Sequence, residues 1–453
     1  MFNVRRTTFL VPSVILMFVL KTSSLKAQNN SNQDSLTKQL PFVISNEKKL
    51  PEEELADKKE GMYLTAIPDI SSDPVNGFGY GAEGSLFFNG KRSDPFFNYT
   101  AYRAKIDIAL FNTTRNQREI QFRWDIPYIF NSKWRLRGEI GYEINPNLLY
   151  FGINEEESLA PLKDSSTTPA KDARYSDYEK NTLTGVNKFY NTYTKKEAIL
   201  NISMERSFIE GRLKTLLGYE IANVRNTSFA GNSLLQNDFN KGLIKGVGNN
   251  VVSFVQAGLI YDTRDLEPDP SNGIFTELTN ELSVKSLGSQ YNFNKTFFHF
   301  NYYHNLFPSV FKKIIFAGRV GIGYTAGNSP FYEYQDEWSA EGSIEGLGGT
   351  NTIRGYKSSR FLSRVMQFSN FELRCRLLQF SKFKQHFAIS AVPFFDVGGV
   401  WDSLDRITTH LNNMRYSEGL GIRIVWNVNT ILRFDYAVSK EDNQFFFQIG
   451  HTF

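Results

Sequence analysis

Polar and apolar residues alternate along most of this chain, in short runs separated by turn residues. In the run 370–377 (Asn-Phe-Glu-Leu-Arg-Cys-Arg-Leu), every even position is polar and every odd position is apolar. Successive residues of a β-strand point to opposite faces, so such a strand has one charged and one oily face. About 16 runs of this kind follow Gly61. The pattern predicts an all-β chain that forms a transmembrane antiparallel β-barrel of about 16 strands.

Composition supports strands rather than helices as the membrane-crossing elements. No apolar run after the first twenty residues approaches the roughly 20 residues that a spanning helix needs. Only 41% of the residues are hydrophobic, yet there are 40 Phe and 22 Tyr, which fits aromatic belts at the two membrane interfaces. A soluble β-sandwich also alternates, but its inward face is apolar and would not carry so many charges opposite aromatic residues.

The N-terminus has the layout of a secretory signal peptide. Two arginines at 5 and 6 precede an apolar stretch from Phe9 to Leu20 and a polar run that ends at Ala27. We predict a signal peptide at 1–27, a short polar periplasmic segment at 28–60 that is either a tether or a plug helix, and a barrel at 61–453.

Connection lengths predict the orientation, because outer-membrane barrels alternate short periplasmic turns with longer surface loops. If the N-terminus is periplasmic, the long connections fall on the outer side only when Met62 to Ile70 is counted as the first strand. The long connections are expected at 146–194, 227–249, 326–365 and 402–414, and the short ones at 131–133, 267–273, 306–312, 381–383 and 426–429.

The first predicted strand contains Pro68, which removes one backbone donor. In a closed barrel this strand pairs with the last one, which we expect to run from Phe445 through Gly450 to Phe453. The seam between them would be short of hydrogen bonds and is a candidate lateral gate. Alternatively, Pro68 only marks the end of its strand.

One arginine, Arg354, stands among glycines in the long loop predicted at 326–365. A guanidinium inside a packed lumen loses its hydration and needs a carboxylate that its planar fork can contact. Glu372 and Asp396 are lumen-facing by alternation. The alternative is an exposed Arg354, with Asp396 paired to a strand neighbour such as Arg423.

Glycines near these residues predict a close approach of the loop to the wall. Gly398 and Gly399 lack side chains and would leave space for the incoming loop. Gly355, directly after the arginine, permits backbone conformations that other residues resist.

Taken in order, these motifs resemble the outer-membrane protein assembly factor, or bacterial surface antigen, superfamily. Arg354 and Tyr356 match the Arg-Gly-aromatic loop motif, Glu372 matches the first strand acid, and Asp396 with Gly398 matches the second strand motif. The resemblance implies an extracellular loop that folds into the barrel, where the acids hold Arg354.

Two further stretches carry the resemblance. Tyr261 to Asp265, followed by Pro270 to Gly273, resembles a strand-to-turn signature before a periplasmic hairpin, in which Asp and Arg cap the strand end. The ending Gln448 to Phe453 looks like the sorting signal of outer-membrane barrels, so barrel assembly machinery is an expected partner.

The chain also departs from the family pattern. Members that assemble other barrels usually carry polypeptide-transport-associated (POTRA) domains, and 28–60 is too short for one. The motif loop is expanded between Glu333 and Gly346, an insertion that includes Trp338 and several acids.

Three functions remain open: a POTRA-less outer-membrane barrel that handles a polypeptide client through the seam or a gated lumen, a solute pore, or a surface-exposed structural barrel. The expected partners are outer-membrane lipid and either a polypeptide client or a periplasmic accessory protein. We expect no enzyme, cofactor, metal or nucleic-acid binding, because the five His show no zinc spacing and no Gly-x-Ser-x-Gly elbow or phosphate loop occurs. A Ser, His and acid brought together on adjacent strands could still escape detection by sequence.

Overall fold

The computed structural model describes residues 39–73, 75–186, 189–228, 233–308, 313–383 and 385–453. The predicted signal peptide at 1–27, and residues 28–38 of the predicted periplasmic segment, lie outside this described part.

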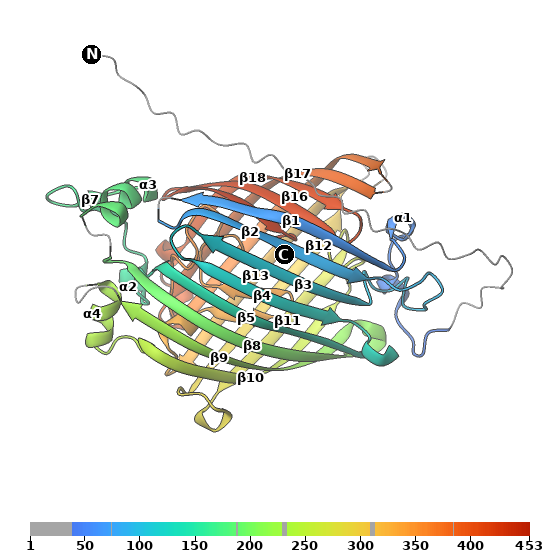
Figure 1. Ribbon diagram of the computed structural model, residues 1–453, viewed down its shortest axis with the longest axis horizontal. Helices are drawn as coiled ribbons and strands as arrows, with labels where there is room; N and C mark the ends of the chain where they lie inside the picture. Colours follow the sequence, from blue (N-terminus) through green and yellow to red (C-terminus); the bar gives the residue numbers. More distant parts are fainter. Residues whose placement is uncertain (1–38, 74, 187–188, 229–232, 309–312, 384) are drawn as a thin grey trace, which may run out of the picture.

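Within these described residues, sixteen strands form one antiparallel sheet that curls into a barrel, as predicted (Figure 1). Alternation builds the wall: in β16, Phe371 is 37% exposed on the outside, whereas Glu372 is 1% exposed toward the lumen. Strands that follow one another along the chain pair with one another, and two small hairpins interrupt the loops. The wall strands are β1 Met62–Asp73, β2 Gly77–Phe88, β3 Ala104–Thr113, β4 Arg118–Ile126, β5 Trp134–Leu149, β8 Thr192–Phe208, β9 Leu213–Ser228, β10 Gly248–Asp262, β11 Gly273–Ser283, β12 Phe293–Asn305, β13 Ile314–Gly327, β16 Val365–Lys382, β17 Gln385–Trp401, β18 Arg415–Trp426, β19 Thr430–Ser439 and β20 Asn443–Ile449.

The two ends of the barrel differ as the connection lengths predicted. The first strand does begin at Met62, and the predicted long connections all emerge at one end, between β5 and β8, β9 and β10, β13 and β16, and β17 and β18. In the described residues, no helix is long and apolar enough to cross a membrane. The small elements of the connections are η2 Ile129–Asn131, α2 Glu155–Ser158, β6 Lys163–Asp164, β7 Lys171–Asp172, α3 Tyr175–Tyr178, η3 Glu179–Val186, η4 Ile209–Gly211, α4 Leu234–Asn240, η5 Lys285–Leu287, η7 Leu404–Ile407 and η8 Leu411–Asn413.

The seam strands depart from expectation in two ways. Pro68 pairs with Ala82 and the strand continues to Asp73, so the proline does not mark the strand's end. The last strand ends at Ile449, and the prediction that it runs to Phe453 was wrong. Gly450 has a φ of 92°, a left-handed conformation that suits glycine, and it turns the chain into the bore.

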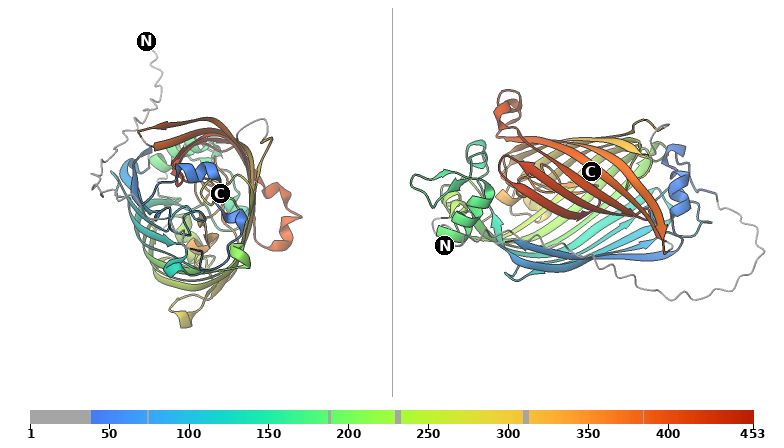
Figure 2. Two further views of the ribbon diagram at one scale, coloured as in Figure 1. Left: turned by 90° about the vertical axis from the view of Figure 1, so that its right-hand side faces the viewer. Right: turned by 90° about the horizontal axis from the view of Figure 1, so that it is seen from above.

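The described part of the N-terminal segment, residues 39–60, lies across the barrel end that has the short turns (Figure 2, left). It contains η1 Asn46–Lys48 and the short helix α1 Glu52–Asp57. Leu50 is buried against apolar residues of three different connections, Ala101, Leu266 and Val428. This packing holds the segment against the mouth.

The connection between β13 and β16 folds back into the barrel. Its first part contains η6 Phe331–Glu333 and a hairpin of β14 Asp336–Ser339 and β15 Gly342–Glu345, which we call the lumen hairpin. Its second part, residues 346–361, we call the finger, and an isolated bridge between Leu347 and Phe361 closes its base. The insertion noted in the sequence therefore forms the hairpin, and the arginine motif forms the finger.

Candidate functional site: the loop inside the barrel

Arg354 of the finger is fully buried and meets both acids that the sequence singled out. Its Nη1 donates to Glu372 Oε1 at 2.7 Å, and its Nε and Nη2 donate to the two oxygens of Asp396 at 2.8 and 2.9 Å. The contact with Asp396 is bidentate, so it fixes the orientation of the guanidinium as well as balancing its charge. Asp396 does not pair with Arg423, and Arg354 is not an exposed loop residue.

Arg354 has further partners that the sequence did not single out. Nη1 also donates to Asp435 Oδ2 and to Thr452 Oγ1, both at 3.0 Å. The guanidinium lies over the ring of Phe394, 3.5 Å from its centroid. Asp435 could have been found, because it occupies a lumen position in an alternating strand, as Glu372 does.

The acids around Arg354 are shared with other arginines of the wall. Glu372 accepts from Arg374 at 2.9 Å and from Arg423 at 3.1 Å, and Arg423 also donates to Asp435. All of these side chains are buried. Because a buried charge needs close partners, removing one member of the cluster leaves the others uncompensated.

The predicted glycines behave differently from one another. A side chain at Gly355 would meet Ser417 Cβ at 3.1 Å, and this glycine has a φ of 102°. A side chain at Gly398 would meet Leu347 of the finger at 2.9 Å, so this position does leave room for the loop. At Gly399 the near atoms are those of Trp401 and Met414, so the expectation of loop space there was wrong.

Tyr356 anchors the finger by packing. It is 3% exposed, and its ring stands edge-on to that of Phe361, with centroids 5.1 Å apart. Its carbonyl accepts from Gly349 N–H at 2.9 Å. It belongs to a buried apolar cluster that joins loop and wall, together with Phe297, Ile344, Leu347, Ile353, Phe361, Met366, Phe368 and Val400.

The last residues of the chain reach the same cluster. Thr452 Oγ1 lies 3.2 Å from Glu372 Oε1, and the Thr452 carbonyl accepts from Arg319 at 3.2 Å. The carbonyl of Phe453 accepts from Arg374 at 2.8 Å. The finger and the residues that follow the last strand are therefore tied to one set of buried charges.

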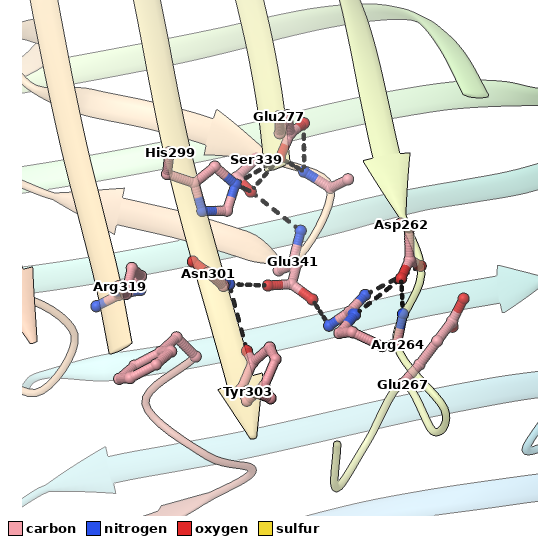
Figure 3. A network of polar contacts seen from close by, with 12 residues as sticks. Asp262, Arg264, Glu267, Glu277, His299, Asn301, Tyr303, Arg319, Ser339 and Glu341 are labelled. Carbon is pink, nitrogen blue, oxygen red and sulfur yellow. Dashed lines mark hydrogen bonds and ion pairs between the residues drawn. The ribbon is translucent and has the colours of Figure 1, made fainter. Parts of the chain in front are cut away.

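The lumen hairpin is held by carboxylates of the wall that accept from its backbone, and one of them, Glu277, appears in Figure 3. Glu277 Oε1 accepts from Ala340 N–H at 3.0 Å, and Glu281 Oε1 accepts from Trp338 N–H at 3.1 Å. The Trp338 ring covers Gly218 of β9, where any added Cβ would lie 2.7 Å from it.

A serine, a histidine and a carboxylate do meet beneath the hairpin (Figure 3). Ser339 Oγ donates to Glu277 Oε2 at 2.7 Å, and His299 Nε2 lies 3.0 Å from the same oxygen. In a hydrolase relay the imidazole stands between hydroxyl and acid and uses both ring nitrogens. Here one ring nitrogen meets both groups, so the arrangement positions the hairpin.

The strand-to-turn signature at Tyr261 to Asp265 also contacts the hairpin. Arg264 donates from Nε to Asp262 Oδ1 at 3.1 Å and from Nη1 to Glu341 at the hairpin tip. The predicted capping role is therefore only part of what Asp262 and Arg264 do.

The loop leaves part of the bore open. Two adjoining cavities of about 560 and 630 Å³ lie between the hairpin, the barrel wall and the last residues of the chain. Acids outnumber bases in the lining, and Glu119, Glu139 and Glu267 line both cavities. Within the described residues, no group of three or more His, Cys, Asp or Glu is arranged to hold a metal ion.

Comparison with known families gives two matches along the chain. The Omp85 superfamily domain matches residues 97–453, and a domain of unknown function, DUF5982, matches residues 40–103. The second match covers most of the described N-terminal segment together with β1 and β2. No curated protein matches the chain.

Solved structures with a similar fold include two outer-membrane proteins. CdiB from Escherichia coli has 10% identity and a TM-score of 0.52, over 86% of this chain and 62% of that one. The BamA structure from Haemophilus ducreyi lacking POTRA domains 1–3 has 13% identity and a TM-score of 0.49, over 87% of this chain and 70% of that one. The chain thus spans less than two thirds of the CdiB chain.

Proposed function

We propose that this chain, which belongs to the Omp85 superfamily, handles a polypeptide client at the seam between β1 and β20 of its outer-membrane barrel. The client would enter as an additional strand at an exposed edge. An accessory protein on the periplasmic side is a further proposed partner.

The observation that carries this proposal is the pairing at the seam. Across the described residues, β1 has ladder partners only in β2, and β20, with seven residues, has them only in β19. A strand edge with unpaired backbone groups is a template for another strand.

Side chains rather than a ladder connect β1 to the base of β19. Thr65 Oγ1 lies 3.2 Å from Thr430 Oγ1, and Asn429 Nδ2 donates to Tyr63 Oη at 2.6 Å. Two such contacts between neutral groups contribute only about 1 kcal/mol each. They support a seam that opens at modest cost.

Site-specific photocrosslinking in cells tests the proposal. A photoreactive residue at Leu64, 48% exposed on the outside of β1, should form adducts with polypeptides. The same residue at Leu217, 62% exposed on β9, is the matched control and should meet lipid only. Equal adduct patterns at the two positions would reject the seam as the client site.

A disulfide across the seam adds a functional test. In a Cys375→Ser background, oxidising Thr65→Cys with Thr430→Cys should abolish adducts from Leu64, and a reductant should restore them. The control pair, Thr65→Cys with Ser85→Cys, joins β1 to β2 at partnered positions without crossing the seam. If both cysteine pairs lose the adducts, the loss comes from having any disulfide on β1 and not from closing the seam.

A solute pore is the second candidate, and the two open cavities beside the hairpin favour it. Planar-bilayer recordings separate the two functions: a steady, large conductance that the seam disulfide leaves unchanged would favour the pore. Brief openings that the disulfide suppresses would favour the seam. We propose no catalytic role, since the hydroxyl of Ser339 donates to Glu277 at 2.7 Å and lies 3.5 Å from the ring nitrogen of His299 that itself contacts Glu277.

A further inference from the structure

The N-terminal segment contacts the mouth of the barrel on several sides. Its backbone and side chains bond to three periplasmic connections, which lie between β8 and β9, β2 and β3, and β12 and β13, and to the start of β17. The pairs are Ser45 N–H with Glu210 O at 2.8 Å, Leu50 N–H with Asn98 O at 2.8 Å, Lys313 Nζ with Glu54 at 3.3 Å, and His386 with Asp57 at 3.0 Å.

One side chain of the segment, Lys48, reaches past the periplasmic turns to the end of a wall strand. Lys48 Nζ lies 2.8 Å from Asp262 Oδ1 at the end of β10, and the Lys48 side chain is only 9% exposed. Burial lowers the pKa of Lys48, although the neighbouring Asp262 opposes this shift. An ammonium group in such a place depends on its carboxylate partner.

The same carboxylate oxygen, Asp262 Oδ1, also accepts a hydrogen bond from Arg264. Arg264 Nε donates to Asp262 Oδ1 at 3.1 Å, and Lys214 lies 3.6 Å from Oδ2. The other end of the Arg264 guanidinium reaches Glu341 at the tip of the lumen hairpin, and Glu341 Oε2 accepts from Asn301 at 3.1 Å (Figure 3).

We propose that the N-terminal segment and the lumen hairpin form one coupled closure of the bore, linked through Asp262 and Arg264. This assigns a role to a region that the family comparison matches only to a domain of unknown function. It goes beyond the seam proposal, because it concerns the bore and requires no client.

The direction of the coupling follows from the shared oxygen. When Lys48 is docked, the Oδ1 oxygen of Asp262 is shared between Lys48 and Arg264, and Arg264 can direct part of its own charge to Glu341. When Lys48 leaves, Asp262 draws Arg264 back, and Glu341 loses its partner at the hairpin tip. Docking of the segment therefore stabilises the hairpin, and by linkage the docked hairpin stabilises the segment.

The test uses a cysteine on the hairpin of the full-length protein in liposomes. In a Cys375→Ser background, Ser343→Cys reports hairpin exposure through its rate of modification by a small charged thiol reagent. Lys48→Met, which keeps the length but not the charge, should raise that rate at least about threefold, within the usual range of such couplings. Lys49→Met, at the exposed neighbouring lysine, should leave it unchanged.

The reverse direction is measured at the segment. Glu341→Gln should speed tryptic cleavage within residues 39–60 by a similar factor, whereas Glu345→Gln on the same hairpin should not. Heat modifiability on gels verifies that each variant is a folded barrel. Faster cleavage in Lys48→Met without faster hairpin modification would overturn the coupling, as would no change in either readout.

Discussion

The finger and the lumen hairpin belong to one loop and enter one bore, yet they are held by opposite arrangements. The finger brings a cation, Arg354, to wall carboxylates on three strands. The hairpin brings backbone N–H groups to two other wall carboxylates, Glu277 and Glu281. The first arrangement is a set of buried ion pairs, and the second consists mainly of hydrogen bonds from backbone N–H groups to carboxylates, with one ion pair between Glu341 and Arg264 at the hairpin tip.

The kind of contact determines how strongly the finger and the hairpin should each be held in the bore. Removing one partner of a buried ion pair costs about 3–5 kcal/mol. A hydrogen bond to a charged group contributes about 1.5–3 kcal/mol. The finger should therefore be the harder of the two to displace, and mutations should release them separately.

The largest effect is expected from reversing charge in the finger's site. Asp396→Arg puts a second guanidinium against Arg354 in a fully buried space, whereas Asp396→Asn keeps the shape and one acceptor. Asp396→Arg should lose heat modifiability on gels or fail to reach the membrane, and Asp396→Asn should retain it. Equal behaviour of the two variants would show that Asp396 acts by shape alone.

Arg354→Ala should come next, with a loss of about 3–5 kcal/mol in the stability of the docked finger. The acids Glu372, Asp396 and Asp435 would lose a shared partner, although Arg423 still serves two of them. Tryptic cleavage after Lys357 should become faster, and modification of Ser343→Cys on the hairpin should not. An unchanged cleavage pattern would contradict the role given to the ion pairs.

The finger was predictable because its chemistry lies in side chains. An arginine among glycines, and two acids at lumen positions, are visible in the sequence, and the structure brings Arg354, Glu372 and Asp396 together. Asp435 follows the same alternation but has no motif beside it. Alternation predicted the barrel and its strand number for the same reason, and connection lengths predicted that the long loops share one end.

The hairpin and the chain end were not predictable in this way. Trp338 and Ala340 are held through backbone N–H groups, which every residue except proline has, so no residue type marks the contact. At the chain end, the period-2 pattern continues past Ile449, but Gly450 turns the chain into the bore, where Thr452 meets Arg354 and Glu372.

A smaller effect is expected where the hairpin meets the wall. Glu277→Ala removes the acceptor of Ala340 N–H and Ser339 Oγ and should cost about 1–3 kcal/mol. A spin label at Ser343 should gain mobility, while cleavage after Lys357 in the finger should not change. Glu277→Gln, which keeps one acceptor, should have the milder effect. Release of the finger by Glu277→Ala would mean that the two parts are one unit.

The smallest effect, and the sharpest contrast, is expected from pH. Glu337 of the hairpin is fully buried, and among the described residues neither of its carboxylate oxygens has a hydrogen-bond partner. Gln335 Oε1, also without a donor, approaches the same place beside Gly323. Burial raises the pKa of Glu337 well above its ordinary value of 4.5, despite the opposing charge of Lys295.

The raised pKa of Glu337 determines how docking of the hairpin changes with pH. Between the ordinary and the raised pKa, the docked hairpin binds more protons than the released one, so docking weakens as the pH rises through that interval, by at most about 1.4 kcal/mol per pH unit. The finger depends on ionised carboxylates and should instead weaken in acid. A spin label at Ser343 should therefore become more mobile from pH 5 to pH 8, and Glu337→Gln should reduce the dependence, with Asp336 and Glu345, whose pKa values burial also raises, accounting for the rest. A label at Ser358 in the finger should show no such rise, and a parallel rise at both positions would erase the distinction between the two parts of the loop.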